Sequence, residues 1–188
     1  MNQAASTKVR IDWQWISWRH GDSWTKDILP QLSDLGVSEA QLKRCVYVIR
    51  ANGNFAIRYP KGNSPTLYIG EGNFKYRLRR HQYWLGELHE LVGDFSFEIG
   101  ICFPRVRNSS KTYCDFEAAL LDEFKDIYGC APLRNSQMER RTRNYDYFPM
   151  EDIRAAIMIG KGVRYKWAIE PMKSSRFYDL YWRTAGSV

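Results

Sequence analysis

The stretch from Cys45 to Gly72, CVYVIRANGNFAIRYPKGNSPTLYIGEG, constrains the fold of this chain more than any other. Short runs of β-branched and aromatic residues alternate there with residues that favour turns, a pattern typical of strands joined by tight connections. The Asn52-Gly53 pair is the strongest local signal for a hairpin. The stretch therefore predicts three short strands, near residues 45–50, 54–59 and 66–70.

Helical patterns follow this stretch. From Phe74 to about Leu91 apolar residues fall on one helical face, and Asn73 stands at the position of an N-cap. Residues 95–103, FSFEIGICF, alternate like a further strand, and a second helix is predicted from Thr112 to Tyr128, closed by Gly129. We expect an α/β fold in which helices cover a small, mostly antiparallel sheet, formed by strands near 45–50, 54–59, 66–70 and 95–103.

The two ends of the chain differ in pattern from this central region, residues 45–136. Residues 1–44 are predicted to form a helical extension, because apolar residues recur at helical spacing before Gly36, at Trp24, Ile28, Leu32 and Leu35. The tryptophans of DWQWISW are expected to pack against the main domain. Residues 137–188 form a basic and aromatic extension, which we expect to be helical or irregular cover.

The composition limits the functions that are open to the chain. The 28 Lys and Arg against 21 Asp and Glu give a net charge of +7, which suits a polyanionic partner such as nucleic acid. A mean hydropathy of −0.52 and the lack of a long apolar run predict no membrane span, and the N-terminus has no signal-peptide pattern. We therefore expect a cytoplasmic protein with no membrane partner.

Cofactor chemistry is also limited by the sequence. The four cysteines lie far apart and only three histidines accompany them, so reduced thiols are expected rather than a zinc site or a disulfide framework. The Gly160-Lys161-Gly162 triplet lacks the flanking pattern of a phosphate-binding loop. No small-molecule cofactor is expected.

The predicted helix after Asn73 carries a dense group of basic residues. Arg77, Arg79 and Arg80 lie within one helical turn, and Arg77, Arg80 and His81 can share a face. Guanidinium groups donate paired hydrogen bonds to phosphate oxygens and keep their charge at any working pH. The group therefore indicates a phosphate site, although a solvated basic face is the alternative interpretation of the helix alone.

Four short motifs stand around this helix in a definite order. They are VYVI with Tyr47, LYIG with Tyr68, DFEAALLDEF with Glu117 and APLRN with Asn135. Together with the arginine helix, the motifs occur in the order found in GIY-YIG endonucleases, and residues 45 to 136 resemble that family. The resemblance implies hydrolysis of a DNA phosphodiester bond with one divalent metal ion, Mg²⁺ or Mn²⁺.

The chain departs from the family pattern in its first motif and in the segment that follows it. Cys45 and Val46 replace the glycine and isoleucine of the first motif. The distance from Tyr47 to Tyr68 is longer than the hairpin common in the family, and the extra strand predicted at 54–59 absorbs the difference.

The resemblance implies roles for the residues that bind water and phosphate. Tyr47 and Tyr68 match the two motif tyrosines, which position or deprotonate the attacking water. A phenol has an unperturbed pKa of about 10 and is a poor base unless nearby cations lower that value. Arg77 matches the arginine that holds the scissile phosphate, with Arg79 and Arg80 as substitutes because the spacing differs by one residue.

The resemblance also implies roles for the remaining site residues. His81 matches a histidine that relays a proton or orients a tyrosine, and Glu117 matches the single acidic ligand of the metal ion. Asn135 matches an asparagine that orders the end of the active-site cleft. Glu71 has no such role, and we expect it to form an ion pair with an arginine rather than to share the metal.

Each residue also has an ordinary structural interpretation when it is taken singly. Tyr47 and Tyr68 fit strand aromatics, Glu117 an exposed helix carboxylate, and Asn135 a turn residue. A catalytically inactive nucleic-acid-binding module on the same fold is therefore the alternative function.

Basic residues of the C-terminal extension are candidates for DNA binding, with packing of its aromatic rings as the alternative role. They are Lys161, Arg164, Lys166, Lys173, Arg176 and Arg183. The oligomeric state stays open, and a dimer on DNA is one arrangement that the sequence allows.

Overall fold

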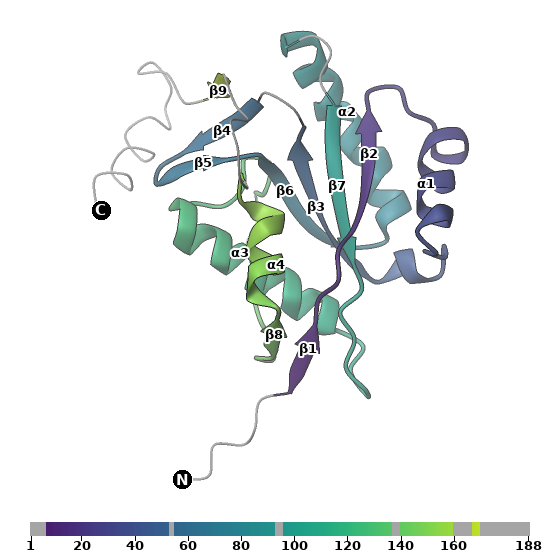
Figure 1. Ribbon diagram of the computed structural model, residues 1–188, viewed down its shortest axis with the longest axis vertical. Helices are drawn as coiled ribbons and strands as arrows, with labels where there is room; N and C mark the ends of the chain where they lie inside the picture. Colours follow the sequence, from purple (N-terminus) through teal and green to yellow (C-terminus); the bar gives the residue numbers. More distant parts are fainter. Residues whose placement is uncertain (1–6, 53–54, 93–95, 137–139, 160–166, 170–188) are drawn as a thin grey trace.

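The computed structural model describes residues 7–52, 55–92, 96–136, 140–159 and 167–169, which form a mixed α/β fold (Figure 1). Its main sheet has four antiparallel strands in the order β2-β7-β3-β6. Their bounds are Gln14–Arg19 for β2, Cys45–Ala51 for β3, Thr66–Gly72 for β6 and Ser96–Cys102 for β7. The mostly antiparallel sheet of the sequence prediction is confirmed.

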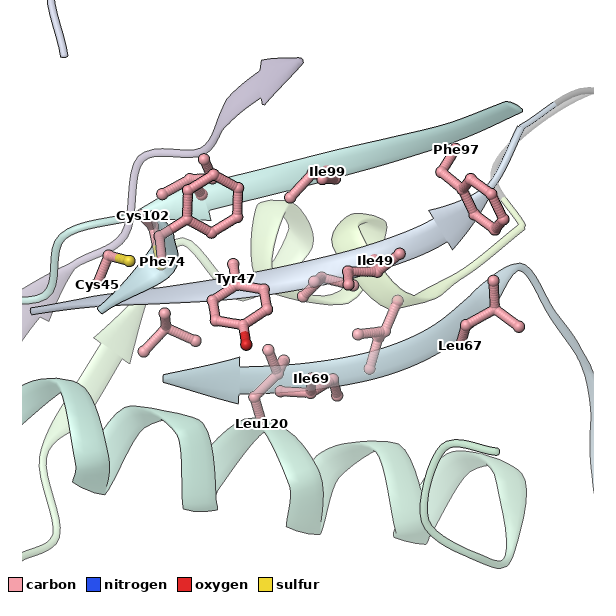
Figure 2. Packing of buried hydrophobic residues seen from close by; sticks show 14 of the residues in the cluster. Cys45, Tyr47, Ile49, Leu67, Ile69, Phe74, Phe97, Ile99, Cys102 and Leu120 are labelled. Atoms are coloured by element: carbon pink, nitrogen blue, oxygen red, sulfur yellow. The ribbon is translucent and has the colours of Figure 1, made fainter. Parts of the chain in front are cut away.

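β3 lies in the middle of this sheet, and all seven of its residues are buried. Successive side chains of a strand point to opposite faces. Tyr47 accordingly faces helix α2 (Phe74–Val92), where its ring lies 5.3 Å from that of Phe74, whereas Arg50 faces helix α4 (Met150–Ile157). Figure 2 shows Tyr47 among the buried residues of this layer, with its hydroxyl oxygen on the side of β6.

Two small sheets flank the main one. The first has the order β5-β4-β9 and the second pairs β1 with β8. Their bounds are Lys8–Arg10 for β1, Phe55–Tyr59 for β4, Gly62–Ser64 for β5, Asp146–Phe148 for β8 and Trp167–Ile169 for β9. The strand expected at 54–59 therefore exists, but it belongs to a separate sheet.

The hairpin predicted at Asn52-Gly53 is wrong. β3 and β4 stand on either side of that pair, yet each strand finds its partners elsewhere. Both edges of β3 are occupied by β6 and β7, so β4 pairs with β5 and β9. The pairing of distant strands thus overrides the local turn signal.

The prediction of a helical N-terminal extension is wrong for residues 8–10, which form β1, and for residues 14–19. Residues 14–19 form β2, which pairs with β7 at the edge of the main sheet. Ile16 and Trp18 are buried while Trp15 and Ser17 are exposed, which is the alternation of a half-buried strand. The helical part follows later, as a π-helical turn η1 (Trp24–Ile28) and α1 (Leu29–Asp34), and a short 3₁₀ turn η2 spans Gln41–Lys43.

Helices cover both faces of the main sheet (Figure 1). α2 begins after Asn73, whose side-chain oxygen accepts a hydrogen bond from the Tyr76 amide at 3.2 Å, as an N-cap does. α3 (Thr112–Tyr128) lies against β3 and β6 and ends at Gly129, which has a φ of 86°. Both helices and the glycine terminator agree with the sequence prediction. No helix in the described ranges combines the length and the apolar character needed to cross a bilayer.

The described part of the C-terminal extension is fixed by hydrogen bonds to the end of α4. The Ile157 carbonyl oxygen accepts hydrogen bonds from the hydroxyl groups of Ser64, Thr66 and Tyr128, at 2.6, 3.3 and 3.2 Å. Arg50 donates to two further carbonyl groups of the same helix end. Since the last carbonyl groups of a helix lack partners within the helix, these side chains satisfy them.

Candidate active site

Two tyrosines and a histidine from three elements meet on the α2 side of the main sheet. The hydroxyl oxygen of Tyr47 on β3 lies 2.9 Å from Nε2 of His81 on α2. The ring of Tyr68 on β6 lies 4.4 Å from the ring of His81 and 5.9 Å from that of Tyr47. Tyr47 is fully buried, whereas Tyr68 is only partly buried. The phenol of Tyr68 is therefore the more accessible of the two.

Gly70 makes room for this meeting. A Cβ atom at this position would lie 2.8 Å from the hydroxyl oxygen of Tyr47 and would overlap the ring of Tyr68. Gly70 stands opposite Tyr47 in the register of β3 and β6. The glycine of the second motif thus allows both phenols to approach one another across the strand pair.

His81 is held at both ring nitrogens. Besides the contact with Tyr47, its Nδ1 accepts a hydrogen bond from the indole N–H of Trp84 at 3.1 Å. Burial, together with the positive charges of Arg77, Arg134 and Arg80, lowers the pKa of His81 to about 4. The imidazole is therefore neutral at neutral pH.

Burial also shifts both phenols away from the phenolate form. It raises the pKa of Tyr47 well above 10.0, and the neighbouring phenol of Tyr68 adds to this rise. Burial raises the pKa of Tyr68 as well, but the positive charge of Arg77 opposes that effect. Arg77 is the second-largest cause for Tyr68, after burial, so its positive charge partly offsets the effect of burial on that phenol.

Arg77 is the arginine of the basic helix that faces this cluster. Burial is the largest cause of the pKa shifts of Tyr47, Tyr68 and His81. The positive charge of Arg77 is a further cause, and it lowers all three pKa values. Its Nη2 lies 3.9 Å from Oε1 of Glu71, so the ion pair expected for Glu71 is present in a long form.

The two substitutes proposed for Arg77 lie elsewhere. Arg79 and Arg80 are both exposed, and Arg80 acts on His81 through its charge. Arg77 is therefore the best placed of the three for a phosphate held beside the phenols.

Glu117 on α3 is buried, with 5% of its surface exposed, so the interpretation as an exposed helix carboxylate is wrong. Burial is the largest cause of the raised pKa of Tyr68, and the negative charges of Glu117 and Glu71 contribute to it. Because β6 is the outer strand of the main sheet, groups from α2 and α3 on opposite faces can both reach its edge.

The carboxylates fit the needs of a hard divalent cation. Mg²⁺ usually keeps several waters and is bound through one or two carboxylates together with phosphate oxygens. Glu117 is a buried carboxylate on α3 whose charge acts on the phenol of Tyr68, and it could supply one such oxygen donor. Within the described ranges, no group of three or more His, Cys, Asp or Glu side chains is arranged to hold a metal ion.

Asn135 acts on the backbone of β6 rather than on the side-chain cluster. Its Oδ1 accepts a hydrogen bond from the Ile69 amide at 3.0 Å, and its Nδ2 donates to the Ile69 carbonyl at 2.7 Å. The Arg134 amide also donates to the Leu67 carbonyl at 2.9 Å. Asn135 thus pairs with the outer edge of the strand that carries Tyr68 and Gly70.

Two residues of the site were not predicted from the sequence. Trp84 contacts His81, and the guanidinium group of Arg134 lies 5.3 Å from the centre of the Trp84 ring. Trp84 follows His81 by three positions on a helix, a spacing that places side chains side by side. The three-residue spacing could therefore have identified Trp84 as a neighbour of His81 from the sequence. Arg134 comes from a distant segment, and no local pattern indicates its position.

The basic residues proposed in the C-terminal extension lie outside the described residues. They are Lys161, Arg164, Lys166, Lys173, Arg176 and Arg183. Their contribution to DNA binding stays a prediction.

The fold and the site define a mixed α/β domain with a tyrosine, histidine and arginine cluster at the edge of an antiparallel sheet. Comparison of the chain with protein-family models, curated proteins and solved structures gave no match. The functional argument therefore rests on the residues of the chain itself.

Proposed function

We propose that this protein is a metal-dependent DNA endonuclease that hydrolyses a phosphodiester bond through a GIY-YIG-type active site. One observation carries the proposal. Residues far apart in the sequence gather around the single phenol of Tyr68, whose ring lies 5.9 Å from that of Tyr47 on β3 and 4.4 Å from that of His81 on α2. The charges of Arg77 from α2 and Glu117 from α3 act on the same phenol. A phosphate placed beside Tyr68 would lie close to a cation and a carboxylate, the groups that phosphoryl transfer needs.

The roles of the residues follow from their charge and exposure. Arg77 has 39% of its side chain exposed and keeps its charge at any working pH, so it binds the non-bridging oxygens of the phosphate. Tyr68 is partly exposed and orients the attacking water by hydrogen bonding. The water oxygen forms a new bond to phosphorus and releases one proton to solvent, while the bond to one sugar oxygen breaks and that oxygen takes up a proton from solvent.

Glu117 is the residue that would hold Mg²⁺ or Mn²⁺. When bound, the ion supplies positive charge that neutralises the phosphate and the leaving oxygen. Tyr47 and His81 are too deeply buried to reach the phosphate directly, with 0% and 7% of their surfaces exposed. Their part is to fix the position of Tyr68.

Plasmid cleavage in the presence of Mg²⁺ or Mn²⁺ tests the proposal. We expect the wild-type protein to nick or cut the plasmid and Glu117→Ala to abolish cleavage while DNA affinity stays largely intact. Asp126→Ala is a matched control, because Asp126 is an exposed carboxylate on the same helix. It should cleave like the wild type.

Two outcomes would contradict the proposal. An undiminished rate in Glu117→Ala removes Glu117 from the metal role. Binding of DNA without cleavage by the wild-type protein, with either metal ion, favours the alternative of an inactive nucleic-acid-binding module.

A further inference from the structure

Trp84 sets the protonation pattern of His81. An indole N–H can only donate a hydrogen bond, so the ring nitrogen that it contacts must be an acceptor. The indole N–H lies 3.1 Å from Nδ1 of His81, and Nδ1 is therefore unprotonated. A neutral imidazole carries a single N–H proton, which must then be on Nε2. Since His81 is neutral at neutral pH, the contact with Trp84 selects one tautomer.

The orientation of Trp84 is itself fixed. The side chain is buried, with 6% of its surface exposed. Its ring meets the ring of Phe97 edge to face at 6.3 Å, and the guanidinium group of Arg134 lies 5.3 Å from the ring centre. These contacts hold the indole so that its N–H stays directed at His81.

The tautomer of His81 then sets the direction of the next hydrogen bond. With its proton on Nε2, His81 donates to the hydroxyl oxygen of Tyr47 at 2.9 Å. The hydroxyl proton of Tyr47 is left to be donated elsewhere, and Tyr68 is the phenol beside it. The ring centres of the two phenols lie 5.9 Å apart, and Gly70 leaves room for the Tyr47 hydroxyl beside the Tyr68 ring.

We propose that Trp84 is a positioning residue that holds His81 in the Nε2–H tautomer and thereby leaves the hydroxyl proton of Tyr47 free to point toward Tyr68. The donors of this series are Trp84, His81 and Tyr47, in that order, and Tyr68 is the phenol beside its end. Tyr68 is the one phenol of the pair that is partly exposed, so the series ends where a water molecule can approach. The consequence for catalysis rests on the proposed nuclease function, whereas the tautomer does not.

The opposite tautomer is incompatible with these contacts. A proton on Nδ1 would point at the indole N–H, so that two donors would face one another. Nε2 would then accept from Tyr47, and Tyr47 would have no proton left for Tyr68. The two tautomers therefore predict opposite directions for the hydrogen bond between His81 and Tyr47, and only the Nε2–H tautomer keeps the hydrogen bond from Trp84.

Nitrogen-15 NMR of the histidine rings tests the tautomer without any assumption about activity. In wild-type protein at neutral pH, we expect Nδ1 of His81 at the shift of an unprotonated ring nitrogen and Nε2 at that of a protonated one. His81→Gln assigns the signals, because the chain has three histidines. Observation of the Nδ1–H tautomer or of an imidazolium overturns the inference.

Trp84→Phe tests the role of the indole N–H, with Trp18→Phe as a matched control. Trp18 is fully buried and packs on Phe97, yet its Nε1 has no hydrogen-bond partner among the described residues. Both variants lose the same volume, but only Trp84→Phe loses the donor to His81. We expect Nδ1–H signal to appear in Trp84→Phe alone, and its plasmid cleavage to fall about tenfold below that of Trp18→Phe, the factor for one buried hydrogen bond.

The His81→Gln background separates a positioning role from a packing role. Glutamine has no tautomer for Trp84 to select, so Trp84→Phe should slow cleavage no further than Trp18→Phe in that background. Equal tautomer populations in wild type and Trp84→Phe would overturn the inference. Absence of cleavage by the wild type, with the Nε2–H tautomer present, would instead refute only the proposed function.

Discussion

Lowering the pH from 7 to 4.5 should destabilise this protein through His81. In the unfolded chain the imidazole has its ordinary pKa of 6.5, whereas burial, aided by the charges of Arg77, Arg134 and Arg80, lowers the folded value to about 4. Between these two values the unfolded state binds more protons, so stability falls as the pH falls. The contribution of the neutral His81 side chain to the free energy of unfolding is fully present above pH 6.5 and is lost as the pH falls toward 4.

The size of the effect follows from the two pKa values. Between pH 7 and 4.5, proton uptake at His81 in the unfolded state removes about 2.5 kcal/mol from the free energy of unfolding. For a chain of this size, that loss corresponds to a fall in melting temperature of about 5–10 °C. Carboxylates also titrate in this range, so the contribution of His81 has to be isolated by substitution.

Urea unfolding at several pH values measures this contribution. His81→Gln removes the titrating group and keeps an amide N–H that can donate to Tyr47, so its pH dependence should be flatter than that of the wild type by about 2.5 kcal/mol. His20→Gln, which replaces an exposed histidine far from Tyr47 in the sequence, serves as the control substitution. Equal slopes for wild type and His81→Gln would refute the conclusion that His81 is neutral in the folded protein.

Three further substitutions probe the geometry of the site. Tyr47→Phe leaves the buried Nε2–H of His81 without its acceptor, and thermal unfolding should show a loss of about 1–3 kcal/mol. Gly70→Ala forces the two phenols apart, and we expect a loss of about 1–3 kcal/mol by urea unfolding together with a slower plasmid cleavage. Asn135→Leu leaves the outer edge of β6 unpaired, so hydrogen exchange there should accelerate and stability should fall by about 1–3 kcal/mol. Wild-type behaviour in any of these measurements would contradict the corresponding contact.

The elements with a clear local period were predictable from the sequence. Strands β3, β6 and β7 and helices α2 and α3 lie within a few residues of their predicted bounds, because apolar residues recur there at the spacing of one element. The N-cap at Asn73 and the terminator at Gly129 are local signals as well. Short-range chemistry therefore fixes most of the central region.

The features that depend on distant partners were not predictable in this way. Residues 14–19 were expected to be helical, although Ile16 and Trp18 alternate with exposed residues, because only pairing with β7 makes this short segment a strand. The position of Arg134 beside Trp84 likewise depends on pairing of its backbone with β6. The site combines residues that local patterns identify with supports that only the fold brings together.

The relation between Glu71 and Arg77 determines whether the site can accept a phosphate. Their closest atoms lie 3.9 Å apart, and such a long, partly exposed ion pair contributes little to stability. A phosphate can offer Arg77 shorter, paired hydrogen bonds and so compete for the guanidinium group. Burial is the largest cause of the raised pKa of Tyr68, and the negative charge of Glu71 is a smaller cause of the same rise. That charge therefore opposes both phosphate binding and phenolate formation.

Glu71→Gln separates the two roles that remain for this carboxylate. If Glu71 only pairs with Arg77, removal of its charge should tighten DNA binding, keep cleavage, and change stability by less than about 1 kcal/mol. If Glu71 shares the metal ion with Glu117, the same substitution should suppress cleavage and raise the Mg²⁺ concentration that cleavage needs. The contact of Glu71 with Arg77 at 3.9 Å favours the first outcome.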